Sequence, residues 1–399
     1  MAESIYEQLE VPTVVNATGT KTRISGSLIR EEAVAAMVDA SKSFVRIEDL
    51  QSRASEMIAD VTGAEAGYVT SGASAGLMMA AAACLAGDDL DAMARLPETE
   101  GIADEIIAPR THRTGYDHAL RAAGATIVDV GSNDQHLGTG SRNTEPWEIE
   151  AAITEETAAV FYLEKVYTEP PLEVVAEIAH AHDVPVIVDA AAEVPPASNL
   201  ERFIDEGADL VVFSGGKAIR GPQTTGILAG RRDLIESVAL QHLDMHAAED
   251  VWLPSGLVDT DALSGVPRQG IGRSLKVGKE ELVGLMKALE LFIDEDTDEL
   301  EAEWLDRSKQ VAAELEAESG LSTHTTEADK TAIAPEVVVS VDEETAGITT
   351  VDLVRGLREE NPRVFVGADS LDAHEFTINP MCMTDDEASY VVERICSYL

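Results

Sequence analysis

Basic residues are scarce in this chain of 399 residues, which has 29 lysines and arginines against 74 aspartates and glutamates. The formal net charge is -45, and the acidic residues are spread along the chain rather than gathered in a tail. Such a surface repels nucleic acid, so we expect no DNA or RNA partner. It is typical of proteins that stay hydrated and dispersed in a very salty cytosol, and therefore predicts a halophilic protein.

Cysteines and long hydrophobic runs are also few. Cys84, Cys382 and Cys396 lie in apolar segments without metal-binding spacing, which predicts reduced thiols and no metal site. The longest apolar run, 77–86, is too short to cross a bilayer, and the first ten residues contain no apolar core of a signal peptide. We therefore expect a cytoplasmic protein without a membrane role. Disorder is excluded because 45% of the residues are hydrophobic and recur periodically.

Lysine is rare, with nine in the chain, and one of the nine stands in an unusual setting. A short apolar run ends at Phe213, and Ser214, two glycines and Lys217 follow as a turn. This pattern predicts a lysine at the end of a buried strand, where its amine has room for a ligand above an apolar floor. A solvated lysine in an ordinary Gly-Gly turn would give the same pattern.

Two segments further upstream favour a ligand. The run 184–189 predicts another buried strand, which ends in Asp189, and the run 66–77 predicts a strand, a loop of small residues and a helix. A helix that starts in such a loop binds anions through its N–H groups and its dipole. An amine, a carboxylate and a phosphate site are what pyridoxal 5'-phosphate requires. The candidate cofactor-binding residues are Gly72, Ala73, Ser74, Asp189, Ser214 and Lys217.

Five blocks stand in order along most of the chain: 16–20 (NATGT), 70–76 (TSGASAG), 111–117 (THRTGYD), 214–223 (SGGKAIRGPQ) and 272–280 (GRSLKVGKE). With them the chain resembles the fold-type I pyridoxal-phosphate enzymes. Within that class it is similar to the family of selenocysteine synthase (L-seryl-tRNA selenium transferase) and D-glucosaminate-6-phosphate ammonia-lyase. The lysine block with its Arg-Gly-Pro-Gln is specific, whereas the Gly-Ala-Ser loop by itself is not.

The resemblance implies two further site residues. His112 follows a predicted strand, 105–109, at the place where related enzymes hold a ring stacked on the cofactor, although a polar surface histidine also fits the sequence. Arg23 follows the N-terminal block, which faces the active site in the family. It is therefore a candidate for holding a substrate anion, and an ordinary surface arginine is the alternative.

A group of cations, Arg273, Lys276 and Lys279, precedes a predicted long helix, 280–300. Incidental cations are disfavoured at this place because they oppose the helix dipole. In so acidic a chain they suit an anion, either a substrate carboxylate or phosphate or the cofactor phosphate of a partner subunit. The candidate substrate-binding residues are thus Arg23, Arg273 and Lys276.

Glu164 and a histidine pair have more than one interpretation. Glu164 ends a predicted strand, 158–163, and either lies near the cofactor or pairs with Lys165. His242 and His246 have the spacing of two zinc ligands on a helix, but Leu243 stands where a glutamate is expected. The pair therefore predicts a solvated helix face or an interface rather than a metal site.

Strands and helices alternate from 67 to 230, which predicts an α/β fold, and the resemblance implies that it is the type I fold of pyridoxal-phosphate enzymes. We expect a mainly parallel seven-stranded sheet, helices on both faces, and ligands at the carboxyl ends of the strands. The predicted strands are 67–71, 105–109, 125–130, 158–163, 185–189, 209–213 and 226–230. An acidic helix, 306–318, a Ser/Thr-rich connector and a small C-terminal α+β domain follow. The expected organisation is an N-terminal segment that packs with the small domain (1–45), a large cofactor-binding domain (46–275) and the small domain (276–399).

The expected activity is that of a lyase, which deaminates an amino acid or an amino-sugar acid such as D-glucosaminate or its 6-phosphate by α,β-elimination. Lys217 would bind the cofactor and then move the α-proton, while Asp189 keeps the ring nitrogen protonated. Selenium transfer to seryl-tRNA is the alternative; the charge and the lack of an N-terminal tRNA-binding extension argue against it. A third possibility is a non-catalytic binding or assembly protein, which would need neither residue.

The expected partners are a small anionic substrate and further copies of the chain. Fold-type I sites are completed across a two-fold interface, so we expect a homodimer or a larger assembly built from dimers.

Overall fold

The computed structural model describes residues 4–131, 144–165, 168–243, 251–252, 256–259, 263, 266, 268–326 and 334–399. The chain divides into two compact units. The larger is Ile29–Asp294, and the smaller combines Met1–Leu28 with Glu295–Leu399. Within the described ranges, no helix has both the length and the apolar character needed to cross a membrane.

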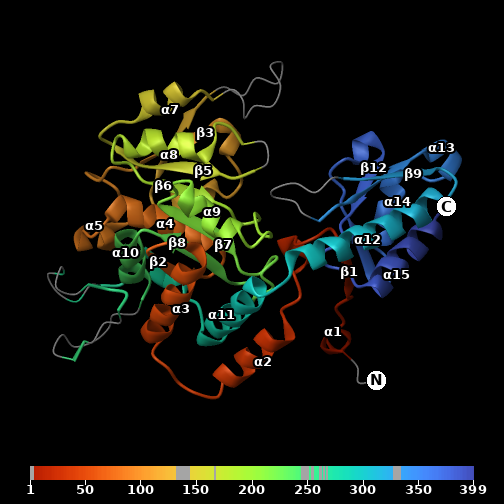
Figure 1. The fold of residues 1–399 in the computed structure, drawn as a ribbon, viewed down its shortest axis with the longest axis horizontal. Coiled ribbons are helices and arrows are strands. Elements are labelled where there is room, and N and C mark those ends of the chain that lie inside the picture. Colours follow the sequence, from red (N-terminus) through yellow and green to blue (C-terminus); the bar gives the residue numbers. More distant parts are fainter. Residues whose placement is uncertain are drawn as a thin grey trace. The chain divides into compact units, whose positions relative to one another are not determined.

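A seven-stranded sheet forms the centre of the larger unit (Figure 1). Its strands are β2 (Ala66–Thr70), β3 (Glu105–Pro109), β4 (Thr126–Val130), β5 (Thr157–Leu163), β6 (Val186–Asp189), β7 (Leu210–Ser214) and β8 (Gly226–Gly230). The order across the sheet is β2-β8-β7-β6-β5-β3-β4. Neighbours from β4 to β7 run parallel, and β8 is antiparallel to both β2 and β7. The predicted fold class is therefore confirmed.

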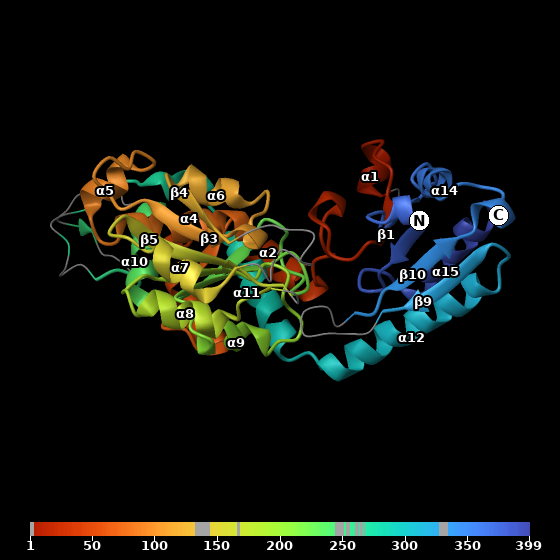
Figure 2. The same cartoon turned by 90° about the horizontal axis from the view of Figure 1, so that it is seen from above.

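Helices cover both faces of this sheet, and Figure 2 shows the two layers. One layer contains α4 (Ala73–Ala86), α5 (Leu90–Arg95), α6 (Asp117–Ala122) and α10 (Arg232–His242). The other contains α3 (Ile47–Thr62), α7 (Pro146–Ala152), α8 (Leu172–His180), α9 (Asn199–Asp205) and α11 (Lys279–Ile293), with α2 (Glu31–Ala40) packed on α11. Successive strand side chains point to opposite faces, so Ile187 joins one apolar core while Val186 and Val188 join the other.

Helix α4 lies against five strands of the sheet, β2 and β5 to β8. Nearly all of its side chains are small and apolar, and ten of its residues are buried. Helices that are apolar all round belong in a core rather than at a surface. Small side chains also let the helix approach the sheet closely, since a Cβ added at Gly76 would lie 3.0 Å from Val212.

The smaller unit has its own sheet and core. An antiparallel sheet of β9 (Leu321–Thr325), β10 (Val337–Val341) and β12 (Glu375–Ile378) has the order β12-β10-β9, and β1 (Val14–Ala17) pairs in parallel with β11 (Arg363–Val366). Helix α12 (Thr297–Glu316) packs on β9 and β10, and α15 (Asp385–Cys396) packs on α12 (Figure 1). Shorter helices are α1 (Ile5–Gln8), α13 (Glu343–Ala346) and α14 (Thr350–Leu357).

Two sequence expectations in this region are wrong. The Ser/Thr-rich segment expected to be a connector contains β9, which pairs with β10 over its whole length and buries only alternate residues. The long helix expected to reach residue 300 ends at Ile293, and α12 begins at Thr297. Asp296 separates them because its side chain caps α12, accepting the N–H groups of the second and third residues of that helix.

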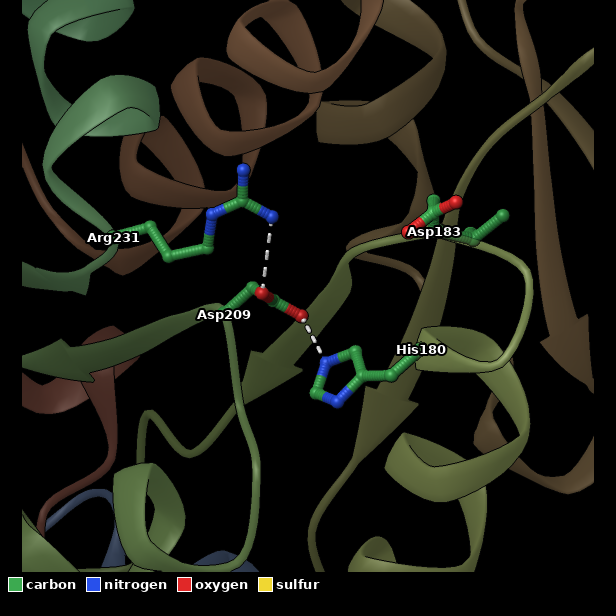
Figure 3. A pocket seen from close by; sticks show the side chains of 5 residues that line it. His180, Asp183, Asp209 and Arg231 are labelled. Atoms are coloured by element: carbon green, nitrogen blue, oxygen red, sulfur yellow. Dashed lines mark hydrogen bonds and ion pairs between the residues drawn. The ribbon is translucent and has the colours of Figure 1, made fainter.

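A polar cluster joins the amino ends of the central strands, at the sheet edge opposite the ends of β6 and β7 (Figure 3). Asp209 precedes β7 and is buried; its Oδ2 accepts the N–H of Val186 and Nε2–H of His180, both at 2.8 Å. Arg231 lies on the other side of the carboxylate, 3.3 Å from Oδ1. The cavity here, of about 360 Å³, is thus lined by groups that already bind one another. We assign the cluster to holding α8, β6 and β8 together.

Candidate functional site

Lys217 and Asp189 come from neighbouring parallel strands and reach the same edge of the sheet. β6 ends at Asp189, which lies opposite Val212 of β7, and the N–H of Ala190 donates to the Val212 carbonyl at 3.0 Å. Lys217 stands in the turn just beyond β7, and its charge acts on the Asp189 carboxylate. The structure therefore brings together the lysine and the acid that the sequence placed at two separate strand ends.

The turn that carries Lys217 is folded tightly back on itself. Its Gly215 N–H donates to the carbonyl of Thr225 at 2.9 Å. A Cβ at Gly215 would lie 2.3 Å from Thr225 Oγ1, and one at Gly216 would lie 2.4 Å from the Cα of Gln223. A residue with a Cβ would clash at either position. The backbone that precedes Lys217 therefore packs directly against Thr225 and Gln223.

Helix α4 begins beside this turn. A Cβ at Gly226, the first residue of β8, would lie 2.5 Å from the carbonyl carbon of Gly72, which precedes the helix. Gly72 has a φ of 96° and no side chain caps the helix, so backbone N–H groups of the first turn, from Ala73 and Ser74, face the loop. Ser74 is exposed and Gly72 is half-buried, which leaves this start accessible to an anion such as a phosphate.

His112 is buried, so the alternative of a surface histidine does not hold. It ends a short 3-10 helix, Arg110–His112, after β3; its Nδ1 accepts the N–H of Leu163 at 3.3 Å, and its ring meets Tyr162 edge-on at 4.9 Å. Burial lowers the pKa of His112 to about 4, against a smaller opposing effect of the Glu169 carbonyl. The ring is thus neutral at pH 7 with its proton on Nε2, and among the described residues Nε2 meets no acceptor in hydrogen-bonding geometry.

Asp189 is 5% exposed, and burial raises its pKa above the ordinary range of an aspartate. The N–H of Ala191, which donates to Oδ1 at 3.1 Å, and the charges of Lys217 and Lys165 offset part of this effect. A buried carboxylate of this kind favours a cationic partner. Together with the open start of α4, it fits pyridoxal phosphate, with its protonated ring nitrogen and its phosphate.

Two of the three clustered cations share a cavity of about 660 Å³. Arg273 lies in a 3-10 helix, Ile271–Leu275, and Lys276 follows it; both line the cavity with Arg46. Lys279 lies apart from them, because its ammonium donates to the Ala40 carbonyl at 2.8 Å and pairs with Glu280. Sequence reasoning missed Arg46, which lies far from Arg273 in the chain and in no matched block.

His242 does not lie on a solvated helix face, so that part of the expectation is wrong. It is buried, and it links Tyr68 to the 3-10 helix: Nδ1 accepts the Tyr68 hydroxyl at 2.8 Å, and Nε2 donates to the Leu275 carbonyl at 3.0 Å. Burial lowers its pKa. His246 lies outside the described residues, and within them no group of side chains is arranged to hold a metal ion.

Glu164 pairs with Arg202 of α9 at 2.9 Å rather than with its neighbour Lys165. Lys165 instead pairs with Glu193, an almost fully buried acid that sequence reasoning did not select. The sequence did contain a signal for Glu193, because this acid stands four residues after Asp189 in the same predicted strand-end turn. Arg23 lies exposed in the smaller unit, in a 3-10 helix, Thr22–Ile24.

Comparison with known proteins shows a consistent set of relatives. Residues 14–250 match the family described as SelA, L-seryl-tRNA selenium transferase. The chain is 30% identical to D-glucosaminate-6-phosphate ammonia lyase of Salmonella typhimurium (strain 14028s / SGSC 2262), over 99% of this chain and 98% of that protein. It is also 30% identical to a 5'-C-glycyluridine monooxygenase-decarboxylase of a Streptomyces species, over 98% of this chain and 90% of that protein.

Comparison with solved structures identifies the same ammonia-lyase as a similar protein. A structure of D-glucosaminate-6-phosphate ammonia-lyase superposes with a TM-score of 0.82 and 29% identity, over 100% of this chain and 98% of that chain. A structure of serine palmitoyltransferase with pyridoxal phosphate gives a TM-score of 0.55 and 15% identity, over 97% of this chain and 86% of that chain. The second likeness concerns the fold alone, and that fold is the type I fold of pyridoxal-phosphate enzymes.

We expect Asp189→Asn to stabilise the cofactor-free protein near neutral pH. Since burial places the folded-state pKa of Asp189 above its unfolded value, the folded chain binds the proton more tightly than the unfolded chain does. This contribution to stability is present below the ordinary pKa of about 4 and is lost as the pH rises through the folded-state value. An amide is neutral throughout and avoids the loss.

Thermal unfolding of both proteins in molar salt, between about pH 4 and pH 8, measures this effect. Asp306→Asn, at an exposed position of α12, controls for the relief of repulsion that follows from removing any carboxylate from so acidic a chain. Equal gains for the two variants at neutral pH would contradict the prediction.

Proposed function

Because the chain belongs to the L-seryl-tRNA selenium transferase family, we propose that it is a pyridoxal-phosphate-dependent lyase that deaminates an anionic amino acid. The observation that carries the proposal is the meeting of Lys217, Asp189 and the uncapped start of α4 at one edge of the sheet. An amine, a buried carboxylate and an anion site lie together there. A relative named as an ammonia lyase, aligned over nearly the whole chain, supports this choice of reaction.

Four parts of the site have separate roles in holding the cofactor. Lys217 binds its aldehyde, Asp189 binds its ring nitrogen, and His112 lies against its ring. The backbone N–H groups at Gly72, Ala73 and Ser74, with Ser214 at the end of β7, hold its phosphate. When bound, pyridoxal phosphate supplies a carbonyl that condenses with amines and a ring that takes up the electron pair left at the α-carbon.

Two side chains move or hold protons during the reaction. The amine of Lys217, released when the substrate amine takes its place, removes the proton from the α-carbon as general base. The ionised carboxylate of Asp189 keeps a proton on the ring nitrogen, and its burial excludes water from that contact. The β-hydroxyl would leave as water with the proton taken from the α-carbon, and hydrolysis by one water would then give a 2-oxo acid and ammonia.

The cations of the 660 Å³ cavity point to the class of substrate. Arg273 and Lys276 bind one anionic group of an amino-sugar acid such as D-glucosaminate or its 6-phosphate. Arg46 lines the same cavity. The acids Glu48 and Glu281, also on its wall, limit how much negative charge the cavity accepts.

Two other activities compete with this proposal. Selenium transfer to seryl-tRNA is suggested by the family's description, but a net charge of -45 opposes the binding of a polyanion. The Streptomyces relative is named as a monooxygenase-decarboxylase, so oxidative decarboxylation of an amino acid is the other.

We expect Lys217→Ala to abolish covalent attachment of the cofactor, since no other lysine occupies the turn after β7. Reduction of the wild-type protein with borohydride, followed by peptide mapping, should place the phosphopyridoxyl group on Lys217. The wild-type protein should also release ammonia and a 2-oxo acid from D-glucosaminate, its 6-phosphate or simple β-hydroxy amino acids in high salt.

Three outcomes would overturn this assignment. A modified lysine elsewhere in the chain would move the site. Selenium incorporation into seryl-tRNA without turnover of the amino acids would favour the transferase, and oxygen uptake with release of carbon dioxide would favour the decarboxylase.

Arg273→Ala should lower kcat/KM roughly ten- to a hundredfold while leaving the absorption spectrum of the bound cofactor unchanged. A hydrogen bond between two charged groups contributes about 1.5 to 3 kcal/mol, and the substrate anion would lose one such bond. Arg53→Ala is a matched control, because Arg53 is exposed on α3 and pairs only with Glu56 among the described residues. Loss of the cofactor spectrum in Arg273→Ala would place this residue at the cofactor instead.

We also propose an assembly built from dimers, in which α2 and the segment after it form a contact. Val34 and Val38 lie four residues apart on α2 and are exposed, and Phe44 is 101% exposed. Apolar side chains gathered in this way mark protein contacts. Two copies of so acidic a chain repel each other, so molar salt is needed to screen them.

Light scattering in molar salt should show an even number of subunits for the wild-type protein, and Phe44→Asp should dissociate it. A fully active monomer would contradict this proposal.

A further inference from the structure

A second lysine–carboxylate pair lies beside Asp189, and the proposed reaction does not use it. Lys165 follows β5, and its ammonium pairs with Oε1 of Glu193. The Glu193 side chain is 3% exposed, whereas 34% of the Lys165 side chain is exposed. The acid is therefore inside the protein, and the lysine reaches it from the rim of the site.

Glu193 and Asp189 belong to one turn. Oδ1 of Asp189 accepts the N–H of Ala191 at 3.1 Å, and the N–H of Glu193 donates to the carbonyl of Ala190 at 3.1 Å. The Asn199 side chain donates to the Glu193 carbonyl and anchors the far end of the turn. A short hydrogen-bonded segment joins the two acids, so a shift of the Glu193 side chain would also move the Asp189 carboxylate.

Lys165 is fixed relative to the same turn by the sheet itself. The N–H of Glu164 donates to the Asp189 carbonyl at 3.1 Å, which continues the β5–β6 pairing past the end of β5. The Glu164 side chain is engaged by Arg202 on the other side. Lys165 is therefore connected to Asp189 in two ways. One is the backbone hydrogen bond between Glu164 and Asp189, and the other is the ion pair of Lys165 with Glu193.

Stability alone is a weak reason for such a pair. A buried ion pair often contributes little net stability, because removing both charges from water costs about as much as their attraction gains. Burial raises the pKa of Glu193, and the charge of Lys165 is the largest of the effects that oppose this, with Lys217 also contributing. The Glu193 carboxylate thus lies in the field of both lysines.

We propose that Lys165 is a positioning residue, which fixes through Glu193 the turn that presents Asp189 to the ring nitrogen of the cofactor. This inference rests on the proposed cofactor. Lys165 touches neither the ring nor the substrate in this role. Its loss should therefore weaken cofactor binding and change the orientation of the ring, while the KM for the substrate changes little.

The experiment separates this role from simple packing with four variants. Lys165→Met removes the charge and keeps most of the stem, but leaves Glu193 buried without its cation. Lys165→Met combined with Glu193→Gln removes both charges, so the fold carries no uncompensated buried charge. Lys165→Arg retains the cation. Lys287→Met is the matched control, because Lys287 is also 34% exposed and pairs with Glu290 on α11.

For each variant we would measure the Kd of pyridoxal phosphate, the visible circular dichroism of the bound cofactor, and the melting temperature without cofactor. Lys165→Met should raise the Kd about tenfold or more, as expected for a lost charge-assisted bond, and lower the melting temperature. The double variant should regain the melting temperature but keep the raised Kd and the altered dichroism. Lys165→Arg should restore the Kd, and Lys287→Met should match the wild-type protein.

The outcomes distinguish this inference from the proposed function. A wild-type protein that takes up no pyridoxal phosphate would overturn both. A wild-type protein that binds it, with a double variant whose Kd recovers together with its melting temperature, would overturn this inference alone and leave the pair a packing feature.

Discussion

The cost of burying carboxylates governs the arrangement of this site. Three acids, Glu164, Asp189 and Glu193, are buried at the carboxyl edge of one sheet, and burial raises the pKa of Asp189 and Glu193. A chain with a net charge of -45 has few cations with which to compensate them. Two have salt-bridge partners, Arg202 for Glu164 and Lys165 for Glu193. Asp189 has the N–H of Ala191 and the more distant charges of the two lysines, which leaves it suited to a cationic ligand.

Much of the fold of the larger unit could be predicted because its elements can be recognised from short stretches of sequence. Six of the seven strands are short apolar runs buried almost throughout, so they stand out between polar segments; β4, at the edge of the sheet, is partly exposed. Parallel strands bring their carboxyl ends to one edge, and for this reason Asp189 and Lys217 could be placed together without a structure. The start of α4 followed from the same order of strand, glycine-rich loop and helix.

The rest depends on contacts between distant parts of the chain. β9 buries only alternate residues, and a half-exposed strand of serine and threonine resembles a loop in sequence. The spacing of His242 and His246 predicts one face of a helix, but spacing alone does not say whether His242 is buried. Arg46 was missed for a related reason, because Arg273 and Lys276, which line the same cavity, lie far along the chain.

The small side chains of α4 bear on how this protein can evolve. A core selected for stability alone would fill the space beneath a helix with leucine or isoleucine, since larger side chains bury more apolar surface. Here the helix lies close to the strands that carry Lys217 and Asp189, and a Cβ added at Gly76 would lie 3.0 Å from Val212 of β7. A larger residue at this buried glycine would therefore displace the first turn of the helix, which the proposed phosphate site needs in place.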